Sequence, residues 1–142
     1  MQELDTSIRQ ALEAYQAAVF AQDAEAFVAL YDQDAVVFDL WGAWSHNGVE
    51  AWRGAVKDWF GSLGSERVLV AFHDVQATVG GDFAVVHAFV TYQGVSAEGK
   101  ELRAMQNRLT WALRQTGGAW KILHEHTSAP VNPETSKVIL QR

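Results

Sequence analysis

The chain has 142 residues, a formal net charge of −6 and no cysteine, and this length suits one domain with a single core. The acidic balance disfavours nucleic acid and anionic membrane surfaces as partners, because both are bound by basic patches that this chain lacks. The missing cysteine excludes disulfides, thiolate nucleophiles and cysteine-ligated zinc, and no apolar run approaches the roughly 20 residues of a membrane helix, so we expect a cytoplasmic protein without a membrane partner.

The N-terminal half predicts helices around one strand. Apolar residues recur at helical spacing over residues 5–22 and again over residues 47–63, which indicates two amphipathic helices. The first is acidic and unlike a signal peptide. Between them, Asp23 is a suitable N-cap for a shorter helix that continues to about Tyr31. The segment AVVFD, residues 35–39, is β-branched and aromatic, as is typical of a strand.

The C-terminal half predicts long strands joined by short turns rich in glycine. The expected strands run from Val68 to Val79, Phe83 to Gln93, Leu102 to Gln115 and Ala119 to Ala129. Helices followed by a meander of strands predict an α+β fold, with three N-terminal helices packed in the concave face of a curved, mainly antiparallel sheet. Residues 1–142 then form a single domain, in which residues 130–142 are a polar, loosely held C-terminal extension.

Two histidines near the end of the last predicted strand are the first candidates for a site. Regular alternation over WKILHEHTS, residues 120–128, places His124 and His126 on one face. Glu125 then belongs to the other face, which is the mixed one that water tolerates. We therefore expect the two imidazoles to point inward and to meet polar partners, because a buried polar group without a hydrogen bond costs roughly 1–3 kcal/mol.

A metal site at these two histidines would need at least a third protein ligand. Asp39, His73 or His87 could supply it, but no spacing singles one of them out. We therefore expect no metal. The favoured interpretation is a hydrogen-bonded pair in which one histidine packs structurally and the other faces a cavity. His126 is the favoured cavity-facing residue and a catalytic candidate, while His124 is a candidate for ligand contact.

Six tryptophans are many for a chain of this length, and four of them fall within residues 41–59. Large aromatic side chains serve a core, a subunit interface or the wall of an apolar pocket. Trp41, Trp44 and Trp52 flank the glycine-containing loop before the third predicted helix. We treat all three as ligand-binding candidates and expect at least one of the two loop residues, Trp41 and Trp44, to touch a ligand.

Four segments resemble the SnoaL-like branch of the nuclear transport factor 2-like superfamily, and together they cover nearly the whole chain. They are AYQAAVFAQDAEAFVALYDQDAVVFD, HNGVEAWRGAVKDWF, GGDFAVVHAFV and GGAWKILHEHTSAP. The last is the most specific, because it is similar to the W-x-x-x-H-x-H-x-S ending of SnoaL-like proteins and of the calmodulin-dependent kinase II association domain. The resemblance implies a cone-shaped sheet around a long helix, an apolar pocket inside the cone and homodimerisation through the sheet.

Ketosteroid isomerase is the catalytic comparison that this resemblance offers. Its general-base aspartate ends the first strand, where this chain has Asp39. Its oxyanion tyrosine corresponds to Tyr15, which stands eight residues before Asp23. Its second oxyanion donor, a protonated aspartic acid, has no counterpart in the matching window 107–111, so steroid isomerisation is not expected. From the residues alone, an Asx turn is the favoured explanation of Asp39, and the resemblance to ketosteroid isomerase brings the base about level with it; core packing explains Tyr15.

His87 and Arg108 complete the ligand-binding candidates, and each has two interpretations. His87 alternates with apolar residues, as a core histidine with a satisfied hydrogen bond would, but the same pattern fits a cavity lining. Arg108 lies opposite the apolar residues of its strand, which favours an outer face. The kinase association domain carries an arginine in a similar place that reaches its pocket, and this resemblance implies an anionic ligand if Arg108 does the same.

Two functions from different classes follow. The first is a SnoaL-like enzyme of the isomerase, cyclase or lyase type, with an apolar pocket for a small aromatic or carbonyl-bearing molecule and no cofactor. Asp39 would move the proton, and His126 and Tyr15 would hydrogen-bond the oxyanion. The alternative is a non-catalytic ligand-binding or assembly module resembling the kinase association domain. Asp39 favours the enzyme, while the missing second carboxyl group and the H-x-H-x-S ending favour the module.

Overall fold

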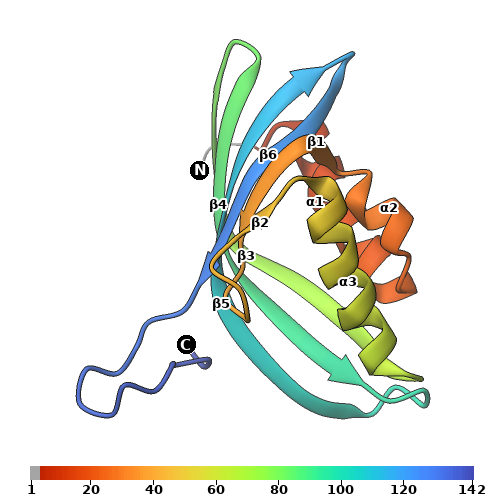
Figure 1. The fold of residues 1–142 in the computed structure, drawn as a ribbon, viewed down its shortest axis with the longest axis vertical. Coiled ribbons are helices and arrows are strands. Elements are labelled where there is room, and N and C mark those ends of the chain that lie inside the picture. Colours follow the sequence, from red (N-terminus) through yellow and green to blue (C-terminus); the bar gives the residue numbers. More distant parts are fainter. Residues whose placement is uncertain (1–3) are drawn as a thin grey trace.

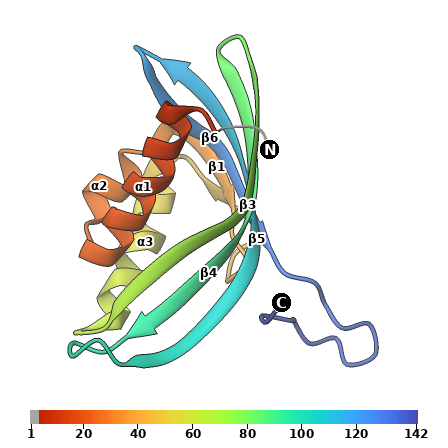
Figure 2. The same cartoon turned by 180° about the vertical axis from the view of Figure 1, so that it is seen from behind.

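The computed structural model describes residues 4–142, which form three helices and one six-stranded sheet (Figure 1). The helices are α1 (Thr6–Ala21), α2 (Ala24–Val28) and α3 (Val49–Leu63). The strands are β1 (Tyr31–Phe38), β2 (His46–Asn47), β3 (Arg67–Gly80), β4 (Phe83–Val95), β5 (Glu101–Thr116) and β6 (Ala119–Ser128). All three helices lie in the concave face of a strongly curved sheet, as both ribbon views show (Figures 1 and 2). The predicted α+β class is confirmed.

The helices face the sheet through the apolar stripes that their periodicity predicts. Asp5 caps α1 by accepting hydrogen bonds from the backbone N–H groups of its first turn. The buried side chains of α1 and α3 include Ile8, Leu12, Tyr15, Val19, Trp52, Val56 and Phe60. α2 is shorter than expected, because Tyr31 already belongs to β1 and not to the helix. Within the described residues, no helix has the length and hydrophobicity that crossing a membrane requires.

The sheet has the order β2-β1-β6-β5-β4-β3. β1 and β6 run parallel and every other pair is antiparallel, so the expected mainly antiparallel sheet is confirmed. β6 follows the other strands in the chain but lies between β1 and β5. This pairing places the residues just after β1 beside the C-terminal part of β6, with Phe38 opposite His126.

A bulge in β6 reverses the side-chain alternation that the sequence suggests. Ile122 pairs with Leu113, and His124 pairs with Ala112, so Leu123 has no partner on β5. Since the extra residue shifts the alternation by one position, Ile122 and Glu125 both point inward, where they are buried.

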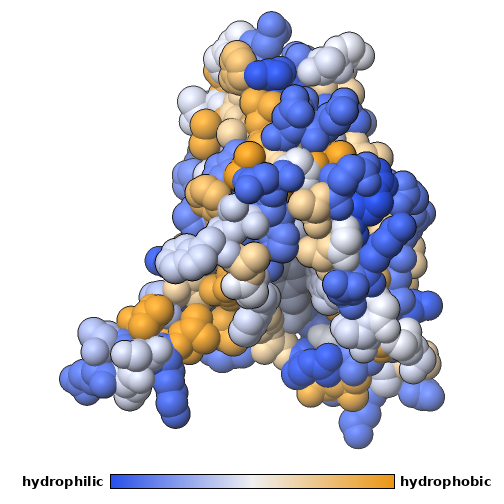
Figure 3. All heavy atoms as spheres, viewed as in Figure 1, coloured by the Kyte–Doolittle hydropathy of each residue, from blue (hydrophilic) through white to orange (hydrophobic). Residues whose placement is uncertain are grey.

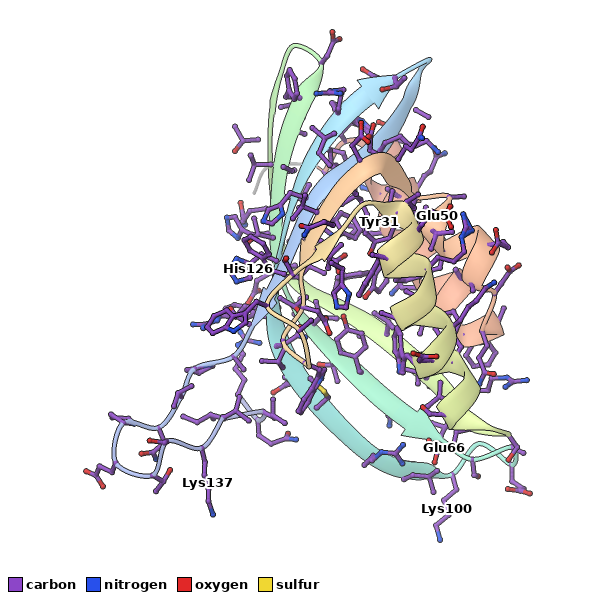
Figure 4. The ribbon with its side chains drawn as sticks, in the orientation of Figure 1. Tyr31, Glu50, Glu66, Lys100, His126 and Lys137 are labelled. Carbon is purple, nitrogen blue, oxygen red and sulfur yellow. The ribbon has the colours of Figure 1, made fainter. Side chains whose placement is uncertain are left out.

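The expectation that His124 and His126 point inward is therefore wrong. His126 is exposed and His124 is half-buried on the convex face, where their rings lie 5.5 Å and 4.8 Å from the ring of Phe38. Figure 4 shows His126 on the side of the sheet away from the helices, whereas Tyr31 points between the sheet and α3. The physical reason is the bulge, which no regular strand pattern contains.

The C-terminal extension leaves the sheet after β6 and returns to β5 (Figure 1). The Gln106 backbone N–H donates to the Leu140 carbonyl oxygen at 2.7 Å, and the Gln141 side-chain amide donates to the Ala104 carbonyl oxygen at 2.7 Å. The Arg142 guanidinium bonds Asp74 at 2.9 Å and lies 3.9 Å from the centre of the Phe89 ring. The extension that we expected to be loose is thus fixed to the sheet at its C-terminal end.

Candidate functional site

A cavity of about 820 Å³ lies inside the curved sheet. Its aromatic lining consists of Tyr15, Trp41, Trp52, Trp59 and Tyr92, and its polar lining includes Asp39, His46, Asp58, Arg103, Asn107 and Glu125. Figure 3 shows the surface hollowed between α3 and the loop around β2. A cavity of this size accommodates a molecule with several rings. Mostly apolar walls with a few polar groups are the usual form of a small-molecule site.

Asp39 follows β1 directly and lines this cavity. Its Oδ2 accepts from the Trp41 backbone N–H at 3.3 Å, and its Oδ1 accepts from the Thr127 hydroxyl at 3.1 Å. The Thr127 hydroxyl in turn accepts from the Leu40 backbone N–H at 2.9 Å. Burial raises the pKa of Asp39, although these hydrogen bonds lower it in part. The Asx turn and the cavity-facing carboxylate are therefore both present.

Glu125 is another carboxyl group of the cavity, and only 1% of it is exposed. The Tyr31 hydroxyl donates to its Oε1 at 2.6 Å, and the Trp111 indole N–H donates to the same oxygen at 2.8 Å. The pKa of Glu125 is raised to about 7, because burial and, to a smaller extent, the charge of Asp39 raise it by more than these two hydrogen bonds lower it. Glu125 is therefore protonated in a large fraction of molecules at neutral pH.

Two tyrosines of the cavity lining, Tyr15 and Tyr92, are hydrogen-bonded to each other. The Tyr15 and Tyr92 hydroxyl oxygens are 2.9 Å apart. The Tyr15 ring packs on Phe27 and Trp111, with centroids at 4.9 Å and 5.8 Å. Burial raises the pKa of both tyrosines above the usual value for a phenol, so both remain neutral hydrogen-bonding groups at physiological pH.

Two buried polar atoms of the lining have no partner within residues 4–142. They are the indole Nε1 of Trp52 and the amide Oδ1 of Asn107. Buried polar atoms are satisfied in most native structures, so each exception calls for an explanation. The His46 ring lies 5.1 Å from the Trp52 ring, which adds another polar group to this part of the cavity. A ligand with oxygen or nitrogen atoms could satisfy these positions.

Four of the predicted site residues line the same cavity, namely Tyr15, Asp39, Trp41 and Trp52. The other five do not line it. Trp44 lies in the loop after β1 and is 97% exposed. The remaining four, His87, Arg108, His124 and His126, lie on the convex face.

His126 is exposed, and the other three residues also have environments typical of the outer surface of a sheet. His87 is exposed, because the apolar face of β4 that it shares is the outer one. The Arg108 Nε–H donates to the Ser128 hydroxyl at 3.1 Å. The His124 Nδ1–H donates to the Val36 carbonyl oxygen at 2.7 Å. The cavity roles expected for these residues are corrected, since the sheet separates them from the cavity.

Sequence reasoning missed Glu125, Tyr92, Asn107 and His46. A signal existed for Asn107, since it alternates with Leu109 and Trp111 on the apolar face of β5. Tyr92 similarly continues the buried alternation of Val86 and Val90. For Glu125 the bulge removed any such signal. Among the described residues, no group of three or more histidine and carboxylate side chains is arranged to hold a metal ion.

Comparisons with known proteins agree with this architecture. Residues 8–132 match the model of the SnoaL-like domain. An NTF2-like protein of unknown function from Pseudomonas putida KT2440 shares 27% identity with a TM-score of 0.83, over 95% of this chain and 92% of that one. No curated protein gives a significant match.

Two more distant solved structures share the fold. One is a candidate calcium/calmodulin-dependent protein kinase II association domain from Xanthomonas campestris, with 18% identity and a TM-score of 0.72 over 94% of this chain and 91% of that one. The other is a candidate aromatic ring hydroxylase from Novosphingobium aromaticivorans, with 24% identity and a TM-score of 0.65 over 86% and 85%. Because the family model matches most of the chain and the fold agrees, the protein belongs to the SnoaL-like domain family.

Proposed function

We propose that the protein is an enzyme that moves a proton on a small aromatic or otherwise apolar, carbonyl-bearing molecule without a cofactor, in an isomerase, cyclase or lyase type of reaction. The observation that carries this proposal is the position of Asp39, a carboxylate of raised pKa at the wall of an aromatic cavity. A carboxylate that is partly desolvated is a stronger base than one in water. The tryptophan and tyrosine rings of the lining form a largely apolar wall that suits an aromatic ligand.

In this proposal Asp39 accepts a proton from the carbon next to the carbonyl group. The Thr127 hydroxyl and the Trp41 N–H hold the carboxylate in one orientation, which reduces the entropy lost when the substrate binds. Tyr15 would hydrogen-bond the oxyanion that forms on the substrate. It would do so either with its own hydroxyl group or through Tyr92, to which it is hydrogen-bonded. Trp41 and Trp52 would contact the ring system of the substrate and exclude water.

Proton exchange tests the proposed base without knowledge of the natural substrate. The probe is 2-tetralone, an aromatic ketone whose α-protons are replaced by deuterium in D₂O, followed by proton NMR. We expect the protein to accelerate this exchange and Asp39→Asn to lower the acceleration by about 10²–10⁴-fold, the usual contribution of general base catalysis. Asp34→Asn removes an exposed carboxyl group from β1, the strand that precedes Asp39, and is the matched control. Equal rates for Asp39→Asn and the wild type would exclude Asp39 as the base.

A second function, a binding or assembly module, is favoured by the convex face of the sheet. Phe38, Leu69, Phe83 and Val85 lie there with exposed fractions from 40% to 53%, and exposed apolar clusters often mark interfaces. We propose that two copies associate through this face as a homodimer. Sedimentation velocity over a concentration series should give a dimer for the wild type and a monomer for Val85→Asp. A monomer at all concentrations of the wild type would exclude the dimer.

A further inference from the structure

We infer that Glu125 is a second catalytic residue, a neutral carboxylic acid that donates a hydrogen bond from Oε2 to the carbonyl oxygen of the bound substrate. This deepens the proposed function, and it rests on the proposal that the substrate bears a carbonyl group. The ketone probe used below tests the hydrogen bond separately from the role of Asp39.

The hydrogen bonds of Glu125 distinguish its two oxygen atoms. Both donors, Tyr31 and Trp111, reach Oε1, while Oε2 accepts no hydrogen bond within the described residues. In a neutral carboxyl group the doubly bonded oxygen is the stronger acceptor, and the other oxygen carries the proton. The two donors therefore select Oε1 as the carbonyl oxygen and leave the proton on Oε2. Since Glu125 lines the cavity, a ligand oxygen bound there can accept this proton in a hydrogen bond.

The surroundings of Glu125 favour its neutral form. Its direct partners are a hydroxyl and an indole N–H, and it forms no ion pair within residues 4–142. The arginine that lines the cavity, Arg103, is already paired with Glu66 at 2.6 Å. A buried carboxyl group without a cation tends to keep its proton.

Position along β6 links Glu125 to the proposed base. Glu125 and Thr127 are two residues apart on the same face of β6 and both are buried, so their Cβ atoms are about 7 Å apart. Because the Thr127 hydroxyl bonds Asp39, the two carboxyl groups lie at neighbouring positions of one wall. Asp39 is partly solvated and Glu125 is fully buried, so the first ionises more readily than the second.

The proposed step conserves all atoms and electrons. The Asp39 carboxylate takes the α-proton, the electrons of that C–H bond form a carbon–carbon double bond, and the carbonyl π electrons move to oxygen. The hydrogen bond from Glu125 stabilises this oxygen as negative charge develops on it, and Glu125 keeps its proton. In a substrate with a carbon–carbon double bond next to the α-carbon the intermediate is a dienolate, and return of the proton from Asp39 to the far carbon of that double bond completes an isomerisation.

The titratable groups around Glu125 decide which controls are needed. They are Tyr31 and Asp39 on the β1 side, Tyr15 on α1, Tyr92 on β4 and His46 on β2, with Asp58 and the Arg103–Glu66 pair elsewhere in the cavity. The tyrosines stay neutral below pH 9, because their pKa values are raised. His46 is the imidazole that lines the same cavity, so a His46 variant is required as a control.

Binding of 2-acetylnaphthalene between pH 5.5 and 8.5 tests the inference, because this ketone does not ionise in that range. Affinity is read from quenching of tryptophan fluorescence. We expect the wild type to lose up to about tenfold in affinity as pH rises through the pKa of Glu125, which corresponds to the loss of one hydrogen bond. Glu125→Gln retains an acceptor for both donors and a cavity-facing N–H group, so it should bind the ketone with no such pH dependence.

Three further variants separate the explanations. Glu125→Leu should bind weakly at every pH, and His46→Gln should keep the pH profile of the wild type. Asp39→Asn should keep the decline in affinity but move it to lower pH, because the Asp39 charge helps to raise the pKa of Glu125. A flat wild-type profile, a profile lost in His46→Gln, or no binding by the wild type at pH 5.5 would overturn the inference. If Asp39→Asn exchanges deuterium normally but the Glu125 results hold, the proposed base is wrong and the hydrogen bond stands.

Infrared spectroscopy supplies a readout that needs no ligand. The difference spectrum between the wild type and Glu125→Gln at pH 5.5 should contain the carbonyl stretch of one neutral carboxylic acid, which should fade as the pH rises through about 7. A carboxylate spectrum for Glu125 at pH 5.5 would show that the residue only anchors Tyr31 and Trp111, and the inference would be wrong.

Discussion

The two faces of the sheet carry polar side chains in very different surroundings. On the concave face, Asp39 and Glu125 are desolvated and their pKa values are raised. On the convex face, His87 and His126 are exposed to solvent. Consecutive positions of β6 thus place the Glu125 carboxyl group in the cavity and the His126 imidazole in water. Burial and hydrogen bonding, more than residue type, decide which of these groups has unusual chemistry.

The largest expected difference between the two faces comes from adjacent residues of β6. Glu125→Leu leaves the Tyr31 hydroxyl and the Trp111 N–H without their shared acceptor. Each unsatisfied buried donor costs about 1–3 kcal/mol, so the free energy of unfolding should fall by about 2–6 kcal/mol. His126→Leu on the exposed face should change it by no more than about 0.5 kcal/mol. Urea denaturation at pH 5 measures both changes. Similar losses of stability for the two variants would show that the two faces do not differ in this way.

A smaller effect should appear when the wild type and Glu125→Gln are compared across pH. The pKa of Glu125 rises from 4.5 to about 7 on folding, so the folded protein holds this proton more tightly than the unfolded chain. The stability that this difference provides is fully present below pH 4.5 and is lost as the pH rises to about 7, for a total of roughly 3 kcal/mol. Urea denaturation at pH 4.5, 6 and 8 should show this decline only in the wild type, and parallel curves would contradict it.

The smallest expected effect concerns the C-terminal anchor on the convex face. Arg142→Ala removes the ion pair with Asp74 and the contact with the Phe89 ring. Both partners of the ion pair are largely exposed, so the free energy of unfolding should fall by no more than about 1 kcal/mol. Thermal unfolding of Arg142→Ala beside Arg142→Lys measures this loss. A loss as large as that of Glu125→Leu would mean that the convex face also carries a critical contact.

The sequence predicted the order of the main helices and strands because their hydrophobic periods are regular. Ile8, Leu12 and Tyr15 follow a helical stripe, and Leu109, Trp111 and Leu113 follow strand alternation. Asp39 could be found for a similar reason, since it ends a clear apolar strand. Regular periods therefore sufficed for the fold and for one carboxyl group of the candidate site.

The rest of the site depends on departures from regularity. The unpaired Leu123 moves Glu125 from the predicted outer face to the inner one. Nothing in the letters WKILHEHTS indicates where the extra residue sits, because either alternation leaves apolar residues on both faces. His46 is a different case. It reaches the cavity through β2, a strand of two residues that is too short to have a periodic signal.

The place of β6 in the sheet has a consequence for how the chain folds during synthesis. A nascent chain releases α1 to α3 and the β3–β5 meander from the ribosome before β6 appears, yet β6 is the strand that joins β1 to β5. Until it emerges, α1 can already pack against β3 and α3 against β1, but β1 pairs with no strand other than β2. Contacts between residues far apart in sequence form slowly. The strand that carries Glu125 and Thr127 therefore completes the sheet and the cavity wall in a single late event.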